Sequence, residues 1–175
     1  MTGFVALLRG VNVGGNKKIA MADLRELLAE LGFGEVKTLL QSGNAVFSGK
    51  GTPASIGTKI EAALAEKHGL TTRCVVRTAK EIQQVVDGHP LADVADNGSR
   101  MMAVFLSETL DAEQAATVEA LDAATIKVGD RVVYQWCPNG ILEAPEIVPF
   151  LLKQWKIHGT ARNWNTVTKI AAAIP

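Results

Sequence analysis

The chain has 175 residues, of which 47% are hydrophobic, and its 18 basic and 18 acidic side chains give a formal net charge of zero. Such a composition is typical of a globular protein that can bury one core or two small ones. The balanced charge excludes a polybasic DNA-coating surface and an acidic tail, so any anion site must be local. Cys74 and Cys137 lie far apart and in no metal-ligand pattern. We therefore expect neither a disulfide framework nor a zinc site.

The apolar run Phe4–Leu8 near the N-terminus is too short for a signal peptide and has no basic segment before it. No apolar run approaches the roughly 20 residues that span a bilayer. These features predict a cytoplasmic protein without a membrane partner.

The first half of the chain predicts the element order β-α-β-β-α-β. The expected elements are a strand over Phe4–Arg9, a helix from Met21 to Gly32, strands over Val36–Gln41 and Ala45–Ser48 around a Ser42-Gly43 turn, a helix from Thr52-Pro53 to Gly69, and a strand over Arg73–Arg77. This is the order of the ferredoxin-like fold. A short helix over Thr78–Val86 follows.

The second half starts the same order again after a connection rich in Gly, Pro, Asp, Asn and Ser. We expect a strand over Met101–Leu106, a helix over Asp111–Leu121, a hairpin of Ile126–Val128 with Arg131–Trp136, a helix over Glu146–Trp155, and a last helix that is capped by Asn165. The sequence thus predicts an α+β protein of two tandem ferredoxin-like halves, the second diverged with a helical C-terminus. The expected boundaries are 1–88, a connection at 89–100, and 101–175.

Acidic residues are absent from both ends of the chain. Residues 1–22 contain Arg9, Lys17 and Lys18 but no carboxylate, and none follows Glu146 in the last 29 residues. If these two segments converge, their cations favour a phosphate, a carboxylate or a nucleotide. The alternative is that both are solvated surface.

The loop R-G-V-N-V-G-G-N-K-K at Arg9–Lys18 joins a strand to a helix, where glycines let backbone N–H groups face one ligand. It lacks the Lys-Ser/Thr that completes a phosphate-binding P-loop, so nucleotide hydrolysis is unsupported. Asn12 is the loop's candidate polar ligand. The alternative is a flexible connection with tight turns.

Two further motifs have both a ligand-binding and a structural interpretation. In the first, Gln41, Ser42 and Asn44 either contact a ligand or simply form a hairpin turn. The second motif is R-N-W-N-T at Arg162–Thr166, in which Trp164 either stacks on a base of a ligand or packs in the core. Its polar ligand candidates are Arg162, Asn163, Asn165 and Lys169.

Catalytic patterns are sparse. Of the three histidines, only His158 lies close to a motif and could act as a general acid or base, although a surface or capping role explains it better. The sequence contains no G-x-S-x-G motif and no Cys next to a His motif. It therefore supports binding more than catalysis and leaves open whether the protein is an enzyme; no metal and no cofactor are expected.

Three strings together resemble the bacterial family known as domain of unknown function 1697: R-G-V-N-V-G-G-N-K-K-I-A-M at Arg9–Met21, L-Q-S-G-N-A-V-F at Leu40–Phe47, and T-A-R-N-W-N-T-V-T-K at Thr160–Lys169. The resemblance implies two ferredoxin-like halves in a cytoplasmic protein and no established activity. Relatives commonly carry a Pro-x-Gly-x-Gly-x-Ser-Lys-like stretch. Here Pro138–Leu142 runs into Glu143-Ala144-Pro145, which replaces a basic contact by an acidic one.

We therefore expect a small anionic ligand, such as a nucleotide or a phosphorylated metabolite, in a cleft between the halves. The alternatives are a single-stranded nucleic-acid-binding module and a ligand-free structural or dimerisation protein. One geometric expectation is specific. The loop after the first strand and the 41–44 turn should lie at opposite ends of the sheet, about 20 Å apart, with the long Arg9–Lys18 loop folding back to join them. Arg162 and Asn163 should close the same cleft.

Overall fold

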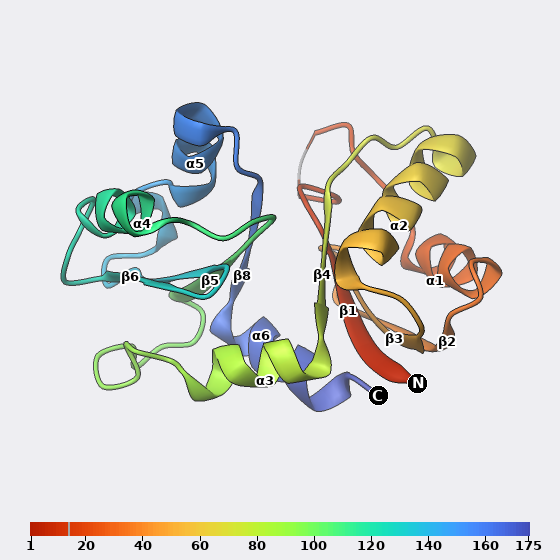
Figure 1. Ribbon diagram of the computed structural model, residues 1–175, viewed down its shortest axis with the longest axis horizontal. Coiled ribbons are helices and arrows are strands. Elements are labelled where there is room, and N and C mark those ends of the chain that lie inside the picture. Colours follow the sequence, from red (N-terminus) through yellow and green to blue (C-terminus); the bar gives the residue numbers. More distant parts are fainter. Residues whose placement is uncertain (14) are drawn as a thin grey trace. The chain divides into compact units, whose positions relative to one another are not determined.

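The protein contains two four-stranded antiparallel sheets and six α-helices (Figure 1). The computed structural model describes residues 1–13 and 15–175. One sheet has the strand order β2-β3-β1-β4 and the other β6-β7-β5-β8. The predicted α+β class is confirmed.

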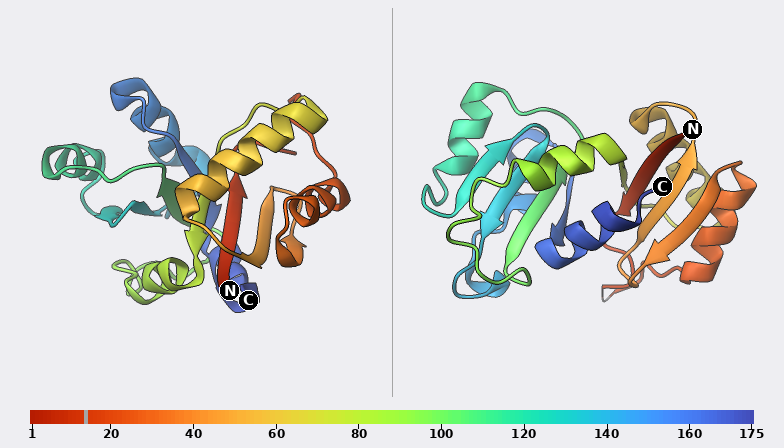
Figure 2. Two further views of the ribbon diagram at one scale, coloured as in Figure 1. Left: turned by 45° about the vertical axis from the view of Figure 1, so that its right-hand side comes forward. Right: turned by 90° about the horizontal axis from the view of Figure 1, so that it is seen from below.

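The chain divides into two compact units. The first unit comprises Met1–Gln83 together with Lys169–Pro175, and the second comprises Gln84–Thr168. Relative to the expected connection at residues 89–100, the division lies earlier, inside α3 (Ala79–Asp87), and a second division lies inside α6 (Trp164–Ala173). The last seven residues are thus part of the first unit, and Figure 2 shows both chain ends close together.

The first unit follows the predicted order of elements. They are β1 (Thr2–Leu8), α1 (Met21–Glu30), β2 (Gly34–Leu39), β3 (Asn44–Gly49), α2 (Pro53–His68), β4 (Cys74–Thr78) and α3 (Ala79–Asp87). The α2 helix shows why the local sequence signals work: the Thr52 hydroxyl accepts from the Ser55 N–H, Pro53 occupies the first turn, and Gly69 ends the helix at φ 60°.

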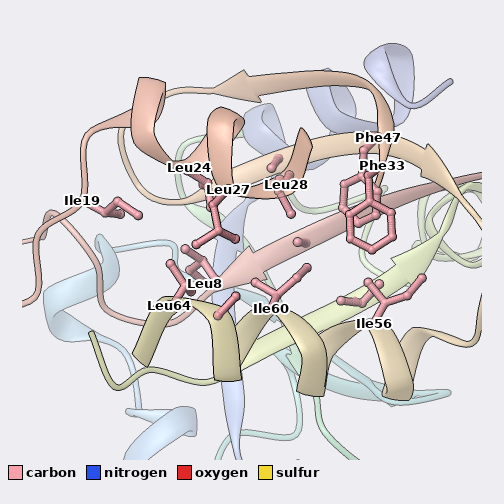
Figure 3. Close-up of a cluster of buried hydrophobic side chains, with 14 of the residues drawn as sticks. Leu8, Ile19, Leu24, Leu27, Leu28, Phe33, Phe47, Ile56, Ile60 and Leu64 are labelled. Atoms are coloured by element: carbon pink, nitrogen blue, oxygen red, sulfur yellow. The ribbon is translucent and has the colours of Figure 1, made fainter. Parts of the chain in front are cut away.

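One face of the first sheet is covered by α1 and α2, and their apolar side chains form a single core (Figure 3). Leu24, Leu27 and Leu28 come from α1 at helical spacing. Phe47 of β3 is fully buried and contacts the Phe33 ring with 4.6 Å between centroids. This core fixes the strands whose ends form the candidate site.

The second unit contains one strand that the sequence did not predict. Its elements are β5 (Met101–Leu106), α4 (Ala112–Glu119), β6 (Ile126–Gly129), β7 (Val132–Trp136), the 3-10 helix η1 (Ile141–Glu143), α5 (Ile147–Trp155), β8 (Gly159–Asn163) and α6 (Trp164–Ala173). The second half is therefore not simply helical after the hairpin. The β8 strand pairs with β5, although it holds two buried polar residues, Thr160 and Arg162, and has no apolar run.

The cap of α6 also differs from the expectation. The Asn163 side-chain oxygen accepts from the Thr166 N–H at 3.0 Å, so Asn163 caps the helix. Asn165 lies within the first turn and is exposed. The prediction of Asn165 as the cap was wrong because the helix begins two residues earlier, at Trp164 directly after β8.

None of the helices among the described residues has the length and apolar character needed to cross a membrane.

Candidate anion-binding site

The loop after β1 and the turn between β2 and β3 lie at the same end of the first sheet. Leu7 pairs with Asn44, and the Leu8 N–H donates to the Gly43 carbonyl at 2.9 Å. The expected separation of about 20 Å was wrong, since β1 and β2 both run antiparallel to β3 and therefore end at one edge. The loop needs no fold across the sheet to reach the turn.

Asn12 joins the loop to the turn. Its side-chain N–H groups donate to the Ile19 and Gln41 carbonyls, both at 2.8 Å, and its side-chain oxygen accepts from the Ile19 N–H at 3.1 Å. Its backbone has φ 56°, a left-handed conformation that Asn tolerates better than most residues. Both amide hydrogens are used within the protein, so the geometry gives Asn12 the role of a clamp.

Gly43 lets the loop pack closely on the turn. A Cβ atom at this position would lie 2.6 Å from Val11 Cγ2 and 2.8 Å from Leu8 Cβ. Its φ of +86° also favours glycine. Val11 itself is fully buried, so the loop is anchored at both Val11 and Asn12.

The turn residues have different exposures. Asn44 is fully buried, and its side-chain N–H groups donate to the Leu39 carbonyl and the Ser42 hydroxyl, each at 3.0 Å. Ser42 is half-buried, and Gln41 is exposed. Asn44 thus has the structural interpretation that the turn motif allowed, while the Gln41 side chain faces solvent beside the clamped loop.

The loop that Asn12 clamps also carries three cations. Arg9 is half-buried, and its backbone is fixed on both sides, since its N–H donates to the Arg73 carbonyl at 3.0 Å and its carbonyl accepts from the Thr72 hydroxyl at 2.6 Å. Lys17 and Lys18 are exposed. None of the ion pairs found among residues 1–13 and 15–175 involves these three cations. The loop therefore concentrates positive charge without internal neutralisation.

The predicted residues in the C-terminal motif have mostly structural contacts. Arg162 is buried, and its guanidinium donates to the Thr160 hydroxyl at 2.8 Å and to the Ala161 carbonyl at 2.9 Å. Asn165 and Lys169 are exposed. The predicted cleft shared by this motif and the Arg9–Lys18 loop stays a prediction.

Trp164 packs against protein rings. Its ring centroid lies 4.3 Å from that of His89 and 6.2 Å from that of Tyr134, whose hydroxyl donates to the Val85 carbonyl at 2.9 Å. Burial lowers the pKa of His89 and raises the pKa of Tyr134 to about 12. These contacts favour the core-packing interpretation of Trp164 over a stacking platform.

Sequence reasoning missed Arg77, which is buried in β4 at the place that Arg162 has in β8. Each arginine stands one residue before the end of the fourth strand of its sheet. The sequence signal for Arg77 was an arginine at the end of a short apolar run.

His158 lies just before β8, where its backbone N–H donates to the Ser107 hydroxyl at 3.2 Å. The described residues contain no cluster of three side chains suited to hold a metal ion.

The chain is similar to a known protein family and to a solved structure. A family model described as "Protein of unknown function (DUF1697)" matches residues 1–134, which include the first two motifs. The solved structure of the conserved bacterial protein SP0830 from Streptococcus pneumoniae is similar, with 27% sequence identity, 98% of each chain covered and a TM-score of 0.75. No curated protein matches the chain significantly. The chain belongs to the family of proteins of unknown function DUF1697, as its motifs predicted.

Proposed function

We propose that this protein binds a small anionic ligand, a nucleotide or a phosphorylated metabolite, at the clamped loop of the first unit. One observation carries the proposal: Asn12 ties the loop to the Gln41 carbonyl, and the loop holds Arg9, Lys17 and Lys18 without a carboxylate partner in the described part of the chain. A folded protein gains little from gathering like charges, so an external anion is the natural partner.

The exposure of the lysines favours a ligand with more than one negative charge. A single exposed ion pair contributes about 1 kcal/mol or less and is screened by salt. A phosphate group can accept from the guanidinium of Arg9 and from an ammonium group together. Phosphorylated compounds therefore fit this site better than a lone carboxylate.

The test is a thermal-shift screen at low salt with pyrophosphate, nucleoside phosphates and sugar phosphates. A ligand at 100 times its Kd stabilises the folded state by about 2.7 kcal/mol, which is readily measured. The double variant Lys17→Gln/Lys18→Gln should lose most of the shift. Lys50→Gln is the matched control, because Lys50 is equally exposed but follows the opposite end of β3. The absence of a shift with every phosphorylated compound at millimolar concentration contradicts the proposal.

We also infer that both units are of the ferredoxin-like type, that the protein is cytoplasmic, and that the second half contributes to ligand binding. The common element and strand orders support the first point. Asn165 is the best probe of the last, because it is the exposed candidate residue that lies within the second unit. If Asn165→Ala leaves the thermal shift unchanged, the second half does not contribute and the cleft between the halves is not the site, whereas the loop site stands.

A further inference from the structure

A hollow in the second unit lies where β7 ends. It encloses about 290 Å³, including the space at its open mouth. Its wall is made by three segments: Asp122 and Thr125 after α4, Trp136 and Cys137 at the end of β7, and the turn that leads through Asn139 to Glu143. The space that the centre of a water-sized sphere can occupy is about 70 Å³, far below the roughly 300 Å³ at which pockets for drug-sized ligands begin, so this hollow suits a small molecule or a single functional group.

Backbone hydrogen bonds hold the wall in place. The Trp136 N–H donates to the Thr125 carbonyl at 2.8 Å, which ties the strand end to the segment after α4. The Cys137 N–H donates to the Arg100 carbonyl at 2.9 Å, and the Gly140 N–H donates to the Cys137 carbonyl at 3.0 Å. The hollow is therefore preformed, which reduces the entropy lost when a ligand binds.

The charge of the lining is negative. Asp122 and Glu143 supply two carboxylates, and no Lys, Arg or His is among the lining residues. One oxygen of Asp122 accepts from the Ala124 N–H at 3.2 Å, which leaves its other oxygen for a ligand. Arg100 lies nearby, but its guanidinium donates to the Pro138 carbonyl at 3.0 Å. No ion pair among the described residues involves Asp122 or Glu143.

An aromatic ring and three apolar residues complete the lining of the hollow. Trp136 is half-buried in the wall, and tryptophan has the strongest affinity for cations among aromatic side chains. Pro138, Ala144 and Pro145 line the same hollow and supply its apolar surface.

We propose that this hollow binds the ammonium group of a small alkylamine. The carboxylates of Asp122 and Glu143 accept from the N–H groups, the Trp136 ring stabilises the positive charge, and Pro138, Ala144 and Pro145 contact the alkyl chain. The site is separate from the loop at Arg9–Lys18, which has the opposite charge, and its existence does not depend on the anion proposal.

The test uses butylammonium as the probe and butan-1-ol as its uncharged counterpart. Titration is followed by two-dimensional NMR of the indole N–H signals of the three tryptophans at low salt, with the Trp136 signal assigned by Trp136→Phe. The expected result is a saturable shift of the Trp136 signal with butylammonium and none with butan-1-ol. Glu143→Gln should weaken the affinity about fivefold, the effect of one partly exposed ion pair.

Glu113→Gln is the matched control, since Glu113 is exposed on α4, carries the same charge and does not line the hollow. It should leave the affinity unchanged. Equal shifts with the alcohol and the amine, equal weakening by Glu143→Gln and Glu113→Gln, or no shift of the Trp136 signal each overturn the proposal. Unchanged backbone signals outside the hollow in both variants show that the fold is intact.

Discussion

The two units are built on one plan, and corresponding hydrogen bonds show how closely. In the first unit the Leu8 N–H at the end of β1 donates to the Gly43 carbonyl in the turn before β3, and in the second the Leu106 N–H at the end of β5 donates to the Arg131 carbonyl before β7. Both distances are 2.9 Å. Gly43 and Arg131 both have positive φ. The backbone of this sheet edge is thus the same in both units.

The next bond along the chain repeats as well. The Arg9 N–H donates to the Arg73 carbonyl at 3.0 Å, and the Ser107 N–H donates to the His158 carbonyl at 2.8 Å. Beyond it the units differ. Residues 9–20 connect β1 to α1, whereas only residues 107–111 connect β5 to α4. The candidate anion site therefore comes from added loop length on a common sheet edge, not from the sheet itself.

The largest expected difference between the units lies in their cores. Phe47 pairs with Phe4, and at the corresponding place in the second unit Gln135 pairs with Met102. Phe47→Ala should lower the free energy of unfolding by about 3–5 kcal/mol, because it empties a buried aromatic site. Gln135→Ala should cost about 1–2 kcal/mol, the loss of its hydrogen bond to the Pro145 carbonyl. Urea unfolding measures both, and equal costs would contradict the comparison.

Gly43 tests the loop that only the first unit has. Gly43→Ala should lower the free energy of unfolding by about 2 kcal/mol, because the new Cβ meets Val11 and Leu8 and φ is positive. It should also weaken anion binding. Gly10→Ala is the control, since Gly10 has φ +66° but nothing within 4 Å of a Cβ. It should cost only the backbone strain, about 1 kcal/mol. Equal losses would show that the loop does not press on the turn.

The N-terminal caps of α3 and α6, the helices that follow the fourth strand of each sheet, should contribute equally to stability. The Thr78 hydroxyl accepts from the Glu81 N–H at 3.1 Å, and the Asn163 side chain makes the corresponding bond to the Thr166 N–H. Thr78→Ala and Asn163→Ala should each lower the free energy of unfolding by about 1 kcal/mol. Thr58→Ala, in the exposed middle of α2, is the control and should have almost no effect. A large difference between the two caps would break the correspondence.

The smallest expected effect is a pH dependence of stability that arises in the second unit. His89 packs against Trp164, and its Nδ1 accepts from the Leu91 N–H at 3.2 Å, a bond that requires the neutral ring. Because burial lowers its pKa, the unfolded chain binds a proton more readily than the folded chain. The contribution of neutral His89 to the free energy of unfolding should be fully present above pH 6.5. It should be lost as the pH drops from 6.5 through the lowered pKa of the folded state. Thermal midpoints between pH 7 and pH 5 measure this loss, and His89→Gln should flatten it.

Elements with regular apolar spacing were predictable from the sequence, as α1 and α2 show. Both helices begin and end within two residues of the predicted limits. The apolar spacing of Met21–Leu28 and the capping residues Thr52 and Gly69 are local signals that need no distant contact. The β8 strand was not predictable, since its pairing with β5 buries Thr160 and Arg162 through contacts distant in the sequence. Alternation of apolar residues cannot report a strand whose buried positions are polar.

The cations of the candidate site could be identified from the sequence, whereas the hydrogen bonds of its amide side chains could not. The acid-free segment pointed to Arg9, Lys17 and Lys18, and the structure finds no ion pair for them among the residues it describes. The sequence allows the amide side chains of Asn12 and Asn44 to contact a ligand, whereas in the structure both donate to backbone carbonyls. An amide can bind a ligand or a carbonyl, and only the tertiary structure decides which one is within reach.

The C-terminal residues have a consequence for how the protein is made. Residues 169–175 belong to the first unit, where a Cβ on Gly3 would lie 2.1 Å from the Pro175 carbonyl oxygen. On the ribosome the N-terminal unit is synthesised first, yet its last piece leaves the exit tunnel after the whole second unit. The second unit can therefore finish folding before the first does. The contact of Gly3 with Pro175 joins residues very far apart in the sequence, so it should form late and slowly.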